Sequence, residues 1–205
     1  MRVRVARAAI VAGAVALVLA AGTAAAPTTG KGAACPAAWK AGWVKLAERI
    51  HAPVYCPTWM PNPLDGRVGG QMQDVYSVSP DRSYLLSFVS FEDGGTGFVH
   101  VNFRGYPGRT AIPKCGTVTT AGNRAIRRMV PCFADPHGTL RVGDILATAY
   151  TVNQGEDEWH VLYAWRHGGS LYTVSEHVHP PYTYKMVLNN LHKLMHSLVL
   201  VEPAQ

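Results

Sequence analysis

The sequence lacks several short motifs that identify common classes of enzyme. It has no Gly-x-Ser-x-Gly nucleophile elbow, no Gly-Lys-Ser/Thr phosphate loop and no His-Glu-x-x-His zinc motif. Residues 92–97 are glycine-rich, but no helical pattern follows them, which indicates a hairpin loop. Internal repeats, low-complexity tracts and a second domain boundary are also lacking. These absences argue against a serine α/β-hydrolase, a P-loop protein and a His-Glu-x-x-His metalloprotease, and they leave no catalytic residue to assign.

Cysteine is scarce, and no pair has the Cys-x-x-Cys spacing of a redox site or the close spacing of a four-cysteine zinc site. The chain has four cysteines, and an even number in an exported protein favours disulfides. Of the possible connectivities we predict the local one, Cys35 with Cys56 and Cys115 with Cys132. Each bond would close a loop of about twenty residues and stabilise the fold by around 3 kcal/mol.

The N-terminal residues have the pattern of an export signal. Residues 1–7 carry three arginines, residues 8–21 are apolar, and residues 22–26 are small, as a signal peptidase requires. We therefore expect a signal peptide over residues 1–26, a flexible tether over residues 27–34, and a secreted or extracytoplasmic location. No cysteine follows the apolar run, which argues against a lipoprotein. An uncleaved single-span anchor is the alternative, and the only membrane contact that this segment would provide.

Acidic residues are few: 13 Asp and Glu stand against 19 Lys and Arg, giving a formal net charge of +6. Removal of Arg2, Arg4 and Arg7 with the signal lowers this charge to +3. A mildly basic, exported chain is not expected to bind nucleic acid.

Both ends of the predicted domain, residues 35–205, have helical periodicity. A helix after Pro36 has one apolar face, formed by Trp39, Trp43, Leu46 and Ile50. A second apolar stripe runs from Tyr184 to Leu198 at three-and-four spacing. Just before it, a hairpin is centred on Gly168 and Gly169. Its predicted pairs share one aromatic face: Trp165–Tyr172, Tyr163–Val174 and Trp159–Val178.

The middle of the chain has the alternation of β-strands. We predict strands over residues 68–78, 84–91, 98–103, 140–142 and 145–152. Residues 104–136 contain several prolines and are predicted to be irregular. The expected fold class is α+β: an antiparallel β-meander of six to eight strands packed against an N-terminal and a C-terminal helix, in a single domain.

Three histidines in or next to the final hairpin are candidate metal ligands. The predicted register places His160 opposite His177, with His179 two residues further along the same face and Glu158 opposite it. Three imidazoles could bind zinc or copper. His-x-His alone is a weak signal, and Pro180 and the next proline replace the Asp-His that follows it in metallo-β-lactamases. The alternative interpretation is an exposed polar sheet face, with no cofactor.

Basic residues are concentrated between residues 104 and 141, where Asp135 is the only acid. Arg124, Arg127 and Arg128 lie closest together. They predict an anion-binding patch, suited to anionic lipid or an acidic wall polymer outside the cell membrane. The alternative is a loop of solvated charges.

Three further features carry a resemblance to a known group. They are a Tyr-x-Pro-x-x-x-Pro segment from Tyr55 to Pro61, a Trp…Gly…Tyr hairpin at Trp165, Gly169 and Tyr172, and a helix ending in Ser197-Leu198. The chain in this respect resembles uncharacterised secreted α+β domains of high-GC Gram-positive bacteria, which are similar to extracytoplasmic domains of anti-sigma-factor-like and envelope-stress proteins. The resemblance implies an envelope-facing binding or structural domain and carries over no catalytic residue.

These observations lead to two functional hypotheses. The first is an exported, non-enzymatic interaction domain of the cell envelope or extracellular space. The second is a metal-binding protein or metal-dependent hydrolase that uses His160, His177 and His179. A pocket beside convergent histidines would favour the second hypothesis.

Overall fold

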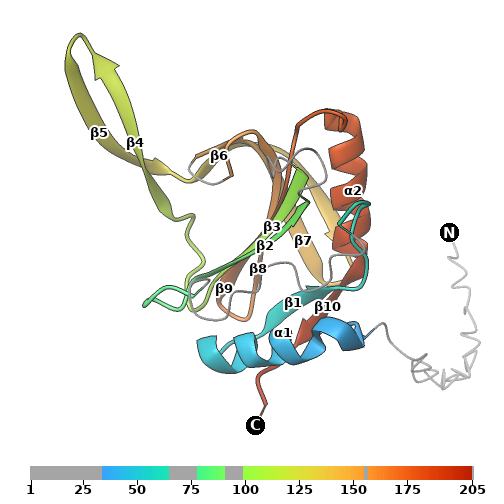
Figure 1. The fold of residues 1–205 in the computed structure, drawn as a ribbon. Coiled ribbons are helices and arrows are strands. Elements are labelled where there is room, and N and C mark those ends of the chain that lie inside the picture. The colour runs from blue at the N-terminus through green and yellow to red at the C-terminus, as the bar shows by residue number, and fades with distance from the viewer. Residues whose placement is uncertain (1–33, 65–77, 91–98, 155–156, 205) are drawn as a thin grey trace, which may run out of the picture. The chain divides into compact units, whose positions relative to one another are not determined.

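The central element of the protein is a six-stranded antiparallel sheet (Figure 1). The computed structural model describes residues 34–64, 78–90, 99–154 and 157–204, which belong to one compact unit, Ala33–Gln205. Its elements in chain order are α1 (Ala37–Ile50), β1 (Val54–Pro57), β2 (Tyr84–Ser90), β3 (Val99–Tyr106), β4 (Lys114–Ala121), β5 (Arg124–Pro131), β6 (Phe133–Val142), β7 (Ile145–Asn153), β8 (His160–His167), β9 (Ser170–His177), α2 (Tyr184–Ser197) and β10 (Leu198–Val201). The α+β class is confirmed.

A glycine turn forms the hairpin of β8 and β9. Gly168 and Gly169 have φ angles of 53° and 75°, a left-handed conformation that glycine adopts without strain and that a two-residue hairpin turn requires. The turn fixes the register of the two strands, and the predicted pairs Trp165–Tyr172 and Tyr163–Val174 are confirmed.

Trp159 does not lie on the predicted aromatic face. Its backbone carbonyl accepts a hydrogen bond of 2.9 Å from the amide of Val178, so the pairing continues to this position. However, Trp159 has a φ of 64°, which turns its side chain out of the strand. The indole is 79% exposed, so the predicted packing of Trp159 is wrong.

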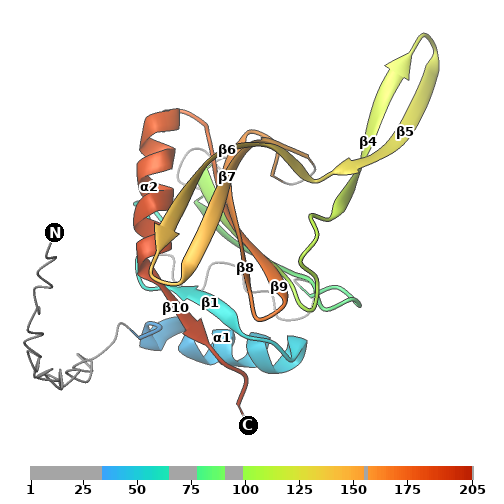
Figure 2. The ribbon, with the colours of Figure 1, turned by 180° about the vertical axis from the view of Figure 1, so that it is seen from behind.

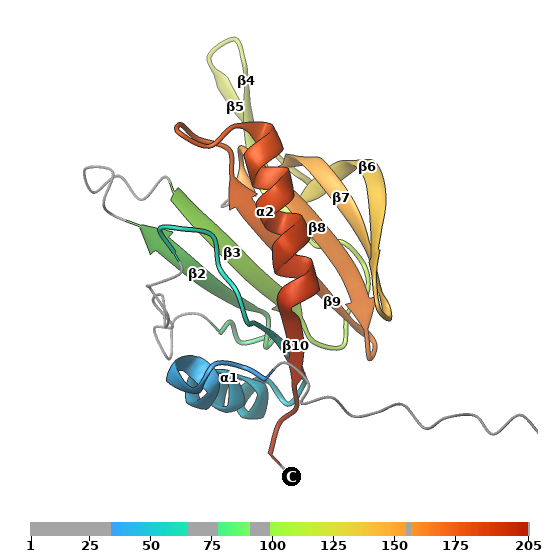
Figure 3. The ribbon, with the colours of Figure 1, turned by 90° about the vertical axis from the view of Figure 1, so that its right-hand side faces the viewer.

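The two helices pack against one face of the sheet and form the main core with it (Figure 3). In α1, Trp39 meets Phe88 edge-to-face at a centroid distance of 5.6 Å, and Trp43 meets Phe103 at 6.0 Å. The hydroxyl of Thr183 caps α2 by accepting from the amide of Met186. The buried residues of α2 are Val187, Leu191, Leu194 and Met195. The predicted apolar face of α1 is therefore buried, whereas the stripe of α2 is buried only from Val187 onward, because Tyr184 is 44% exposed.

The strand order of the sheet is β2-β3-β9-β8-β7-β6, which is not a simple meander. Strands β6 to β9 do follow one another, but β9 then pairs with β3, which is far away in sequence. The meander prediction is therefore only partly correct. The C-terminal region also differs from the prediction. The helix ends at Ser197, and Leu198 begins β10, which pairs with β1 in a separate two-stranded sheet.

Residues 104–136 are not irregular, and that prediction is wrong. β4 and β5 form a hairpin, which we call the arm (residues 114–131). Gly122 and Asn123 form its two-residue turn, with Gly122 at a φ of 60°. Pro107 and Pro113 lie between strands and Pro131 ends β5, whereas Pro136 lies inside β6 beside a shift of register. Figures 1 and 2 show the arm extending away from the six-stranded sheet.

Two disulfides join the predicted partners. Cys35 and Cys56 connect the start of α1 to β1, and Cys115 and Cys132 close the base of the arm. Disulfides persist in oxidising compartments, so both bonds fit an extracytoplasmic location. The predicted signal peptide, the tether apart from Ala34 and the predicted strand over residues 68–78 apart from Val78 lie outside the described residues.

Candidate functional site

Three histidines form a row across three neighbouring strands. His177 in β9 lies opposite His160 in β8, as the hairpin register predicts. On its other side β9 pairs with β3 through Glu176 and Val101, and one step along both strands brings His100 beside His177. The ring centroids of His100 and His160 are 4.7 Å apart, and those of His177 lie 5.1 and 5.0 Å from them. The three rings therefore form a nearly equilateral triangle.

The row lies on the sheet face opposite the helices. Side chains alternate along a strand, and Val101 and Val161 belong to the helix-covered core, so the adjacent His100 and His160 point away from it. His160 is only 4% exposed, whereas His100 and His177 are half-buried. The alternative prediction of an exposed polar face is therefore wrong for His160.

Hydrogen bonds define the protonation of His160. Its Nδ1 lies 2.8 Å from the backbone carbonyl oxygen of Glu158, and a carbonyl can only accept, so Nδ1 donates. In the neutral ring Nε2 is then an acceptor, and His100 donates to it through its own Nε2 at 2.9 Å. Burial lowers the pKa of His160 to about 4, assisted by the nearby imidazoles of His100 and His177 and opposed by the Glu158 carbonyl. His160 is thus neutral at physiological pH.

The remaining members of the predicted metal set are placed differently. Glu158 contributes its backbone carbonyl to the site, because it lies in a turn before β8 and its side chain is exposed. His179 contacts His177 at a centroid distance of 5.7 Å, and its Nδ1 donates to the carbonyl of Pro180 at 2.7 Å. Among the described residues, no three His, Cys, Asp or Glu side chains direct their donor atoms at a common point in the orientations that the structure shows. We call His100, His160, His177 and His179 the histidine cluster.

A buried carboxylate lies next to the histidine cluster. Asp157 accepts from Asn102 Nδ2 at 3.0 Å and from Ser175 Oγ at 2.9 Å through one oxygen. Its other oxygen accepts from Arg104 Nε at 2.7 Å. The donors come from β3 and β9, so Asp157 ties the turn before β8 to both strands. This turn supplies the Glu158 carbonyl, and Asp157 therefore helps to position His160.

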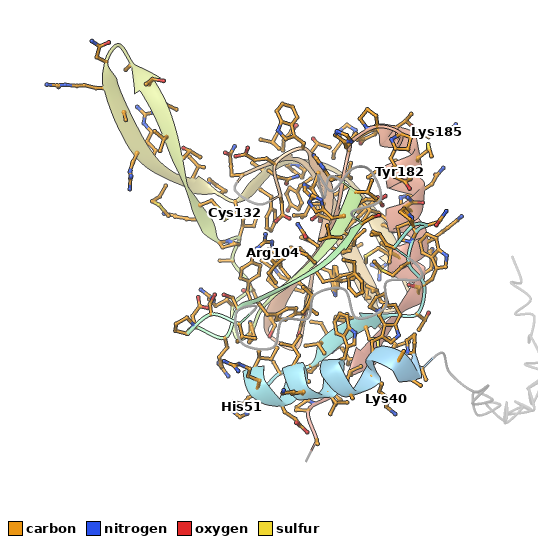
Figure 4. The ribbon with its side chains drawn as sticks, in the orientation of Figure 1. Lys40, His51, Arg104, Cys132, Tyr182 and Lys185 are labelled. Carbon is orange, nitrogen blue, oxygen red and sulfur yellow. A yellow bond between two sulfur atoms is a disulfide. The ribbon has the colours of Figure 1, made fainter. Side chains whose placement is uncertain are left out.

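A pocket of about 300 Å³ opens near Asp157, between the sheet and the base of the arm. Arg104 and Asp157 line it together with the half-cystines Cys115 and Cys132. Figure 4 shows Arg104 on the sheet and Cys132 at the base of the arm. None of the described residues that line the pocket is a histidine. It therefore does not favour the hydrolase hypothesis, which requires a cavity beside the imidazoles.

The arm is a strongly basic element. It contains Lys114, Arg124, Arg127 and Arg128 and no Asp or Glu, and each of these four residues is exposed. The remainder of the predicted basic region does not join them. Arg104 is paired with Asp157, and Arg109 donates to Asp81 at 2.6 Å. The arm therefore carries the largest group of exposed cations in this region, and Arg141 is exposed separately in β6.

The predicted patch of three arginines is divided between the two faces of the arm. Opposite residues of a hairpin share a face, and the register pairs Val118 with Arg127. Arg124 and Arg128 alternate with Arg127 and therefore occupy the other face, together with Ile126. The three arginines therefore lie on one element but on both of its faces, because the strand period of two separates Arg127 from its neighbour Arg128.

Apolar side chains on the arm are also exposed. The exposed fractions are 62% for Val118, 62% for Met129 and 37% for Ile126. Val118 and Met129 share the face of Arg127, and the sulfur of Met129 lies over Gly116. Both faces of the arm therefore combine cationic and apolar groups.

Comparison with known proteins gives no relative of the chain. No family model matches it, and neither the curated proteins nor the solved structures include a significant match. Within the described residues, no helix is both long and apolar enough to span a membrane. The function must be inferred from the histidine cluster and the arm themselves.

Two features of these sites were missed at the sequence level. His100 alternates with core residues Val99 and Val101, which indicates its face but not its partner strand. The Gly122-Asn123 dipeptide between two threonine- and arginine-containing runs is a two-residue hairpin signal, and it could have revealed the arm.

Proposed function

We propose that this protein is an extracytoplasmic, non-enzymatic interaction domain that docks on an anionic lipid surface through the arm. The supporting observation is the composition of the arm: four exposed cations, no acid, and three exposed apolar side chains on a two-stranded ribbon. Cations near an anionic membrane each contribute about 1 kcal/mol of attraction. Apolar side chains add affinity by entering the boundary between headgroups and acyl chains.

The apolar side chains favour lipid over an acidic wall polymer as the partner. A hydrated polyanion offers phosphate or carboxylate charges but no apolar phase, so it would gain nothing from Val118 or Met129. Exposure of both residues to water is unfavourable, and burial in a membrane interface removes that surface from water. The two disulfides and the resemblance to envelope domains agree with a location where such a surface is present.

The first test changes the charge of the arm. We expect the variant Arg124→Gln/Arg127→Gln/Arg128→Gln to bind phosphatidylglycerol-containing vesicles about hundredfold more weakly than the wild type at low salt, because three cations are lost. Vesicle co-sedimentation over a series of lipid concentrations measures the affinity. Added salt should weaken wild-type binding through screening.

A matched control separates the arm from net charge. Lys40→Gln/Arg49→Gln/Lys185→Gln removes the same charge from exposed positions, and Figure 4 shows Lys40 and Lys185 on the helices, away from the arm. It should bind like the wild type. Equal weakening in both triple variants would refute docking through the arm.

The choice of lipid over polymer has its own test. Val118→Thr/Met129→Gln keeps every cation but removes apolar surface, so it should bind vesicles more weakly and soluble polyphosphate as the wild type does. If this variant binds both as the wild type does, the partner is a polyanion and the lipid proposal is wrong.

A further inference from the structure

The spacing of three histidine rings matches that of a metal site. An imidazole nitrogen lies about 2.0–2.1 Å from zinc, so three rings arranged tetrahedrally about one ion have centroids about 5 Å apart. In the protein the three separations are 4.7 Å for His100 and His160, 5.1 Å for His100 and His177, and 5.0 Å for His160 and His177. The strands thus already hold the three rings at the required separation.

The hydrogen bond inside the cluster occupies the place that an ion would take. His100 and His160 approach through their Nε2 atoms, which are 2.9 Å apart. One proton must lie between them, since two lone pairs would repel. Two nitrogen ligands of a tetrahedral ion are about 3.3 Å apart. To admit an ion, the two nitrogens must move apart by only a few tenths of an ångström. The proton on Nε2 of His100 is released to solvent and Nδ1 of the same ring takes one up, so the ring stays neutral and Nε2 gains a lone pair.

The backbone around His160 prepares its Nε2 as a ligand. The Glu158 carbonyl accepts from Nδ1 at 2.8 Å, and a backbone carbonyl in this position is a common outer partner of metal-bound histidine. It fixes the tautomer in which Nε2 carries the lone pair, and it fixes the orientation of the ring. Asp157 holds the turn that presents this carbonyl, through its bonds to Asn102, Ser175 and Arg104.

We propose that His100, His160 and His177 bind one zinc or copper(II) ion, the borderline ions that imidazole ligands prefer. His100, from β3, thereby takes the place that the hairpin alone would give to His179. The His177 ring stacks on His160 at an interplanar angle of 23°, so it must turn to direct a nitrogen towards the other two. His177 is partly exposed, so one side of its ring borders solvent. The site does not depend on the arm.

Titration of metal-free protein with zinc tests the proposal. We expect one ion per chain by calorimetry and a rise in melting temperature with zinc concentration by mass action. His100→Gln and His177→Gln should each weaken zinc binding by about a hundredfold or more, since loss of even an outer partner costs ten- to a hundredfold. Circular dichroism in the presence of chelator verifies that each variant is folded.

Two further variants define the ligand set. His196→Gln removes an exposed histidine from α2, and His179→Gln removes the outermost ring of the cluster; both should bind zinc as the wild type does. No binding at millimolar zinc would overturn the proposal. So would a His100→Gln variant that binds normally while His179→Gln does not.

A measurement on the wild type alone covers the case in which a variant fails to fold. In protein with ¹⁵N-labelled histidine, zinc should shift the ring nitrogens of His100, His160 and His177 at one equivalent. Shifts confined to His51, His192 or His196 would assign the ion to another surface and refute the site.

Discussion

Asp157→Ala is expected to lower the free energy of unfolding by about 3–5 kcal/mol, because it leaves a charge and two donors without their acceptor in a buried network. The side chain of Asp157 is 10% exposed and that of Arg104 17%. Asn102 and Ser175, which donate to the same carboxylate, are 3% and 1% exposed. The substitution therefore leaves the buried donors of Asn102 and Ser175 without an acceptor, and Arg104 without its countercharge beside the pocket. Urea denaturation monitored by tryptophan fluorescence measures the change.

A second ion pair in the chain provides a matched control. Arg109 donates to Asp81 at 2.6 Å, but these side chains are 45% and 52% exposed. Exposed pairs contribute little, so Asp81→Ala should cost less than about 1 kcal/mol. Equal losses in the two variants would show that Asp157 has no special role in the fold. The double variant Asp157→Ala/Arg104→Ala should cost less than the sum of its parts, since it removes the unpaired charge together with its partner.

The structural features that are determined by residues close together in the chain were predictable from the sequence. The hairpin register follows from Gly168 and Gly169, and the helices follow from the spacing of residues such as Trp39, Trp43 and Leu191. Both disulfides close short loops, which favoured the local pairing. In each case the physical signal is contained within about twenty residues.

The pairing of β3 with β9 was not predictable in the same way. Residues such as Val101 and Glu176 are 75 positions apart, and the alternation of a strand indicates which face is buried but not which strand lies beside it. A meander would place β3 beside the next strand in sequence. The arm instead occupies that part of the sequence, outside the sheet. His100 therefore joins the histidine cluster through long-range topology.

The hairpin also shows where local reasoning fails at an element end. Strand alternation assigns Trp159 to the face of Tyr163 and Trp165, but the positive φ of Trp159 breaks the alternation there. The same turn buries Asp157 and aims the Glu158 carbonyl at His160. Backbone geometry at that point depends on the bonds to Asp157, and two of their three donors, Asn102 and Arg104, come from β3, outside the hairpin.

The second large effect that we expect is a fall in stability between pH 6.5 and 8, caused by Glu176. This side chain faces α2 and is 4% exposed. Its Oε1 accepts from Asn190 Nδ2 at 2.8 Å, and its Oε2 has no hydrogen-bond partner in the described part of the chain. Burial raises the pKa of Glu176 from 4.5 to about 8, although the bond from Asn190 opposes the rise. The carboxyl is therefore mostly protonated in the folded protein at pH 7.

The sign of the effect follows from the two states. The folded-state pKa of Glu176 lies above its unfolded value. The contribution of Glu176 to the free energy of unfolding is therefore fully present below about pH 4.5 and is lost as the pH rises through 8. His160 acts in the opposite direction, because its pKa falls from 6.5 to about 4 on folding; its contribution is present above 6.5 and is lost as the pH falls. The two dependences oppose each other between about pH 4.5 and 6.5, where stability should be nearly level.

Above pH 6.5 only the dependence from Glu176 remains, so the wild type should lose about 1.4 kcal/mol per pH unit, or about 2 kcal/mol up to pH 8. Glu176→Gln keeps an acceptor for Asn190 but does not titrate, so its stability should be level from pH 6.5 to 8. Below pH 6.5 it should decline with falling pH, because the opposing effect of His160 is no longer offset.

Urea denaturation with chelator present, which keeps the histidine cluster metal-free, measures both curves. Glu48→Gln, which removes an exposed carboxyl from α1, should retain the wild-type decline. A wild type whose stability stays level or rises from pH 6.5 to 8 would show that Glu176 is ionised in the folded protein.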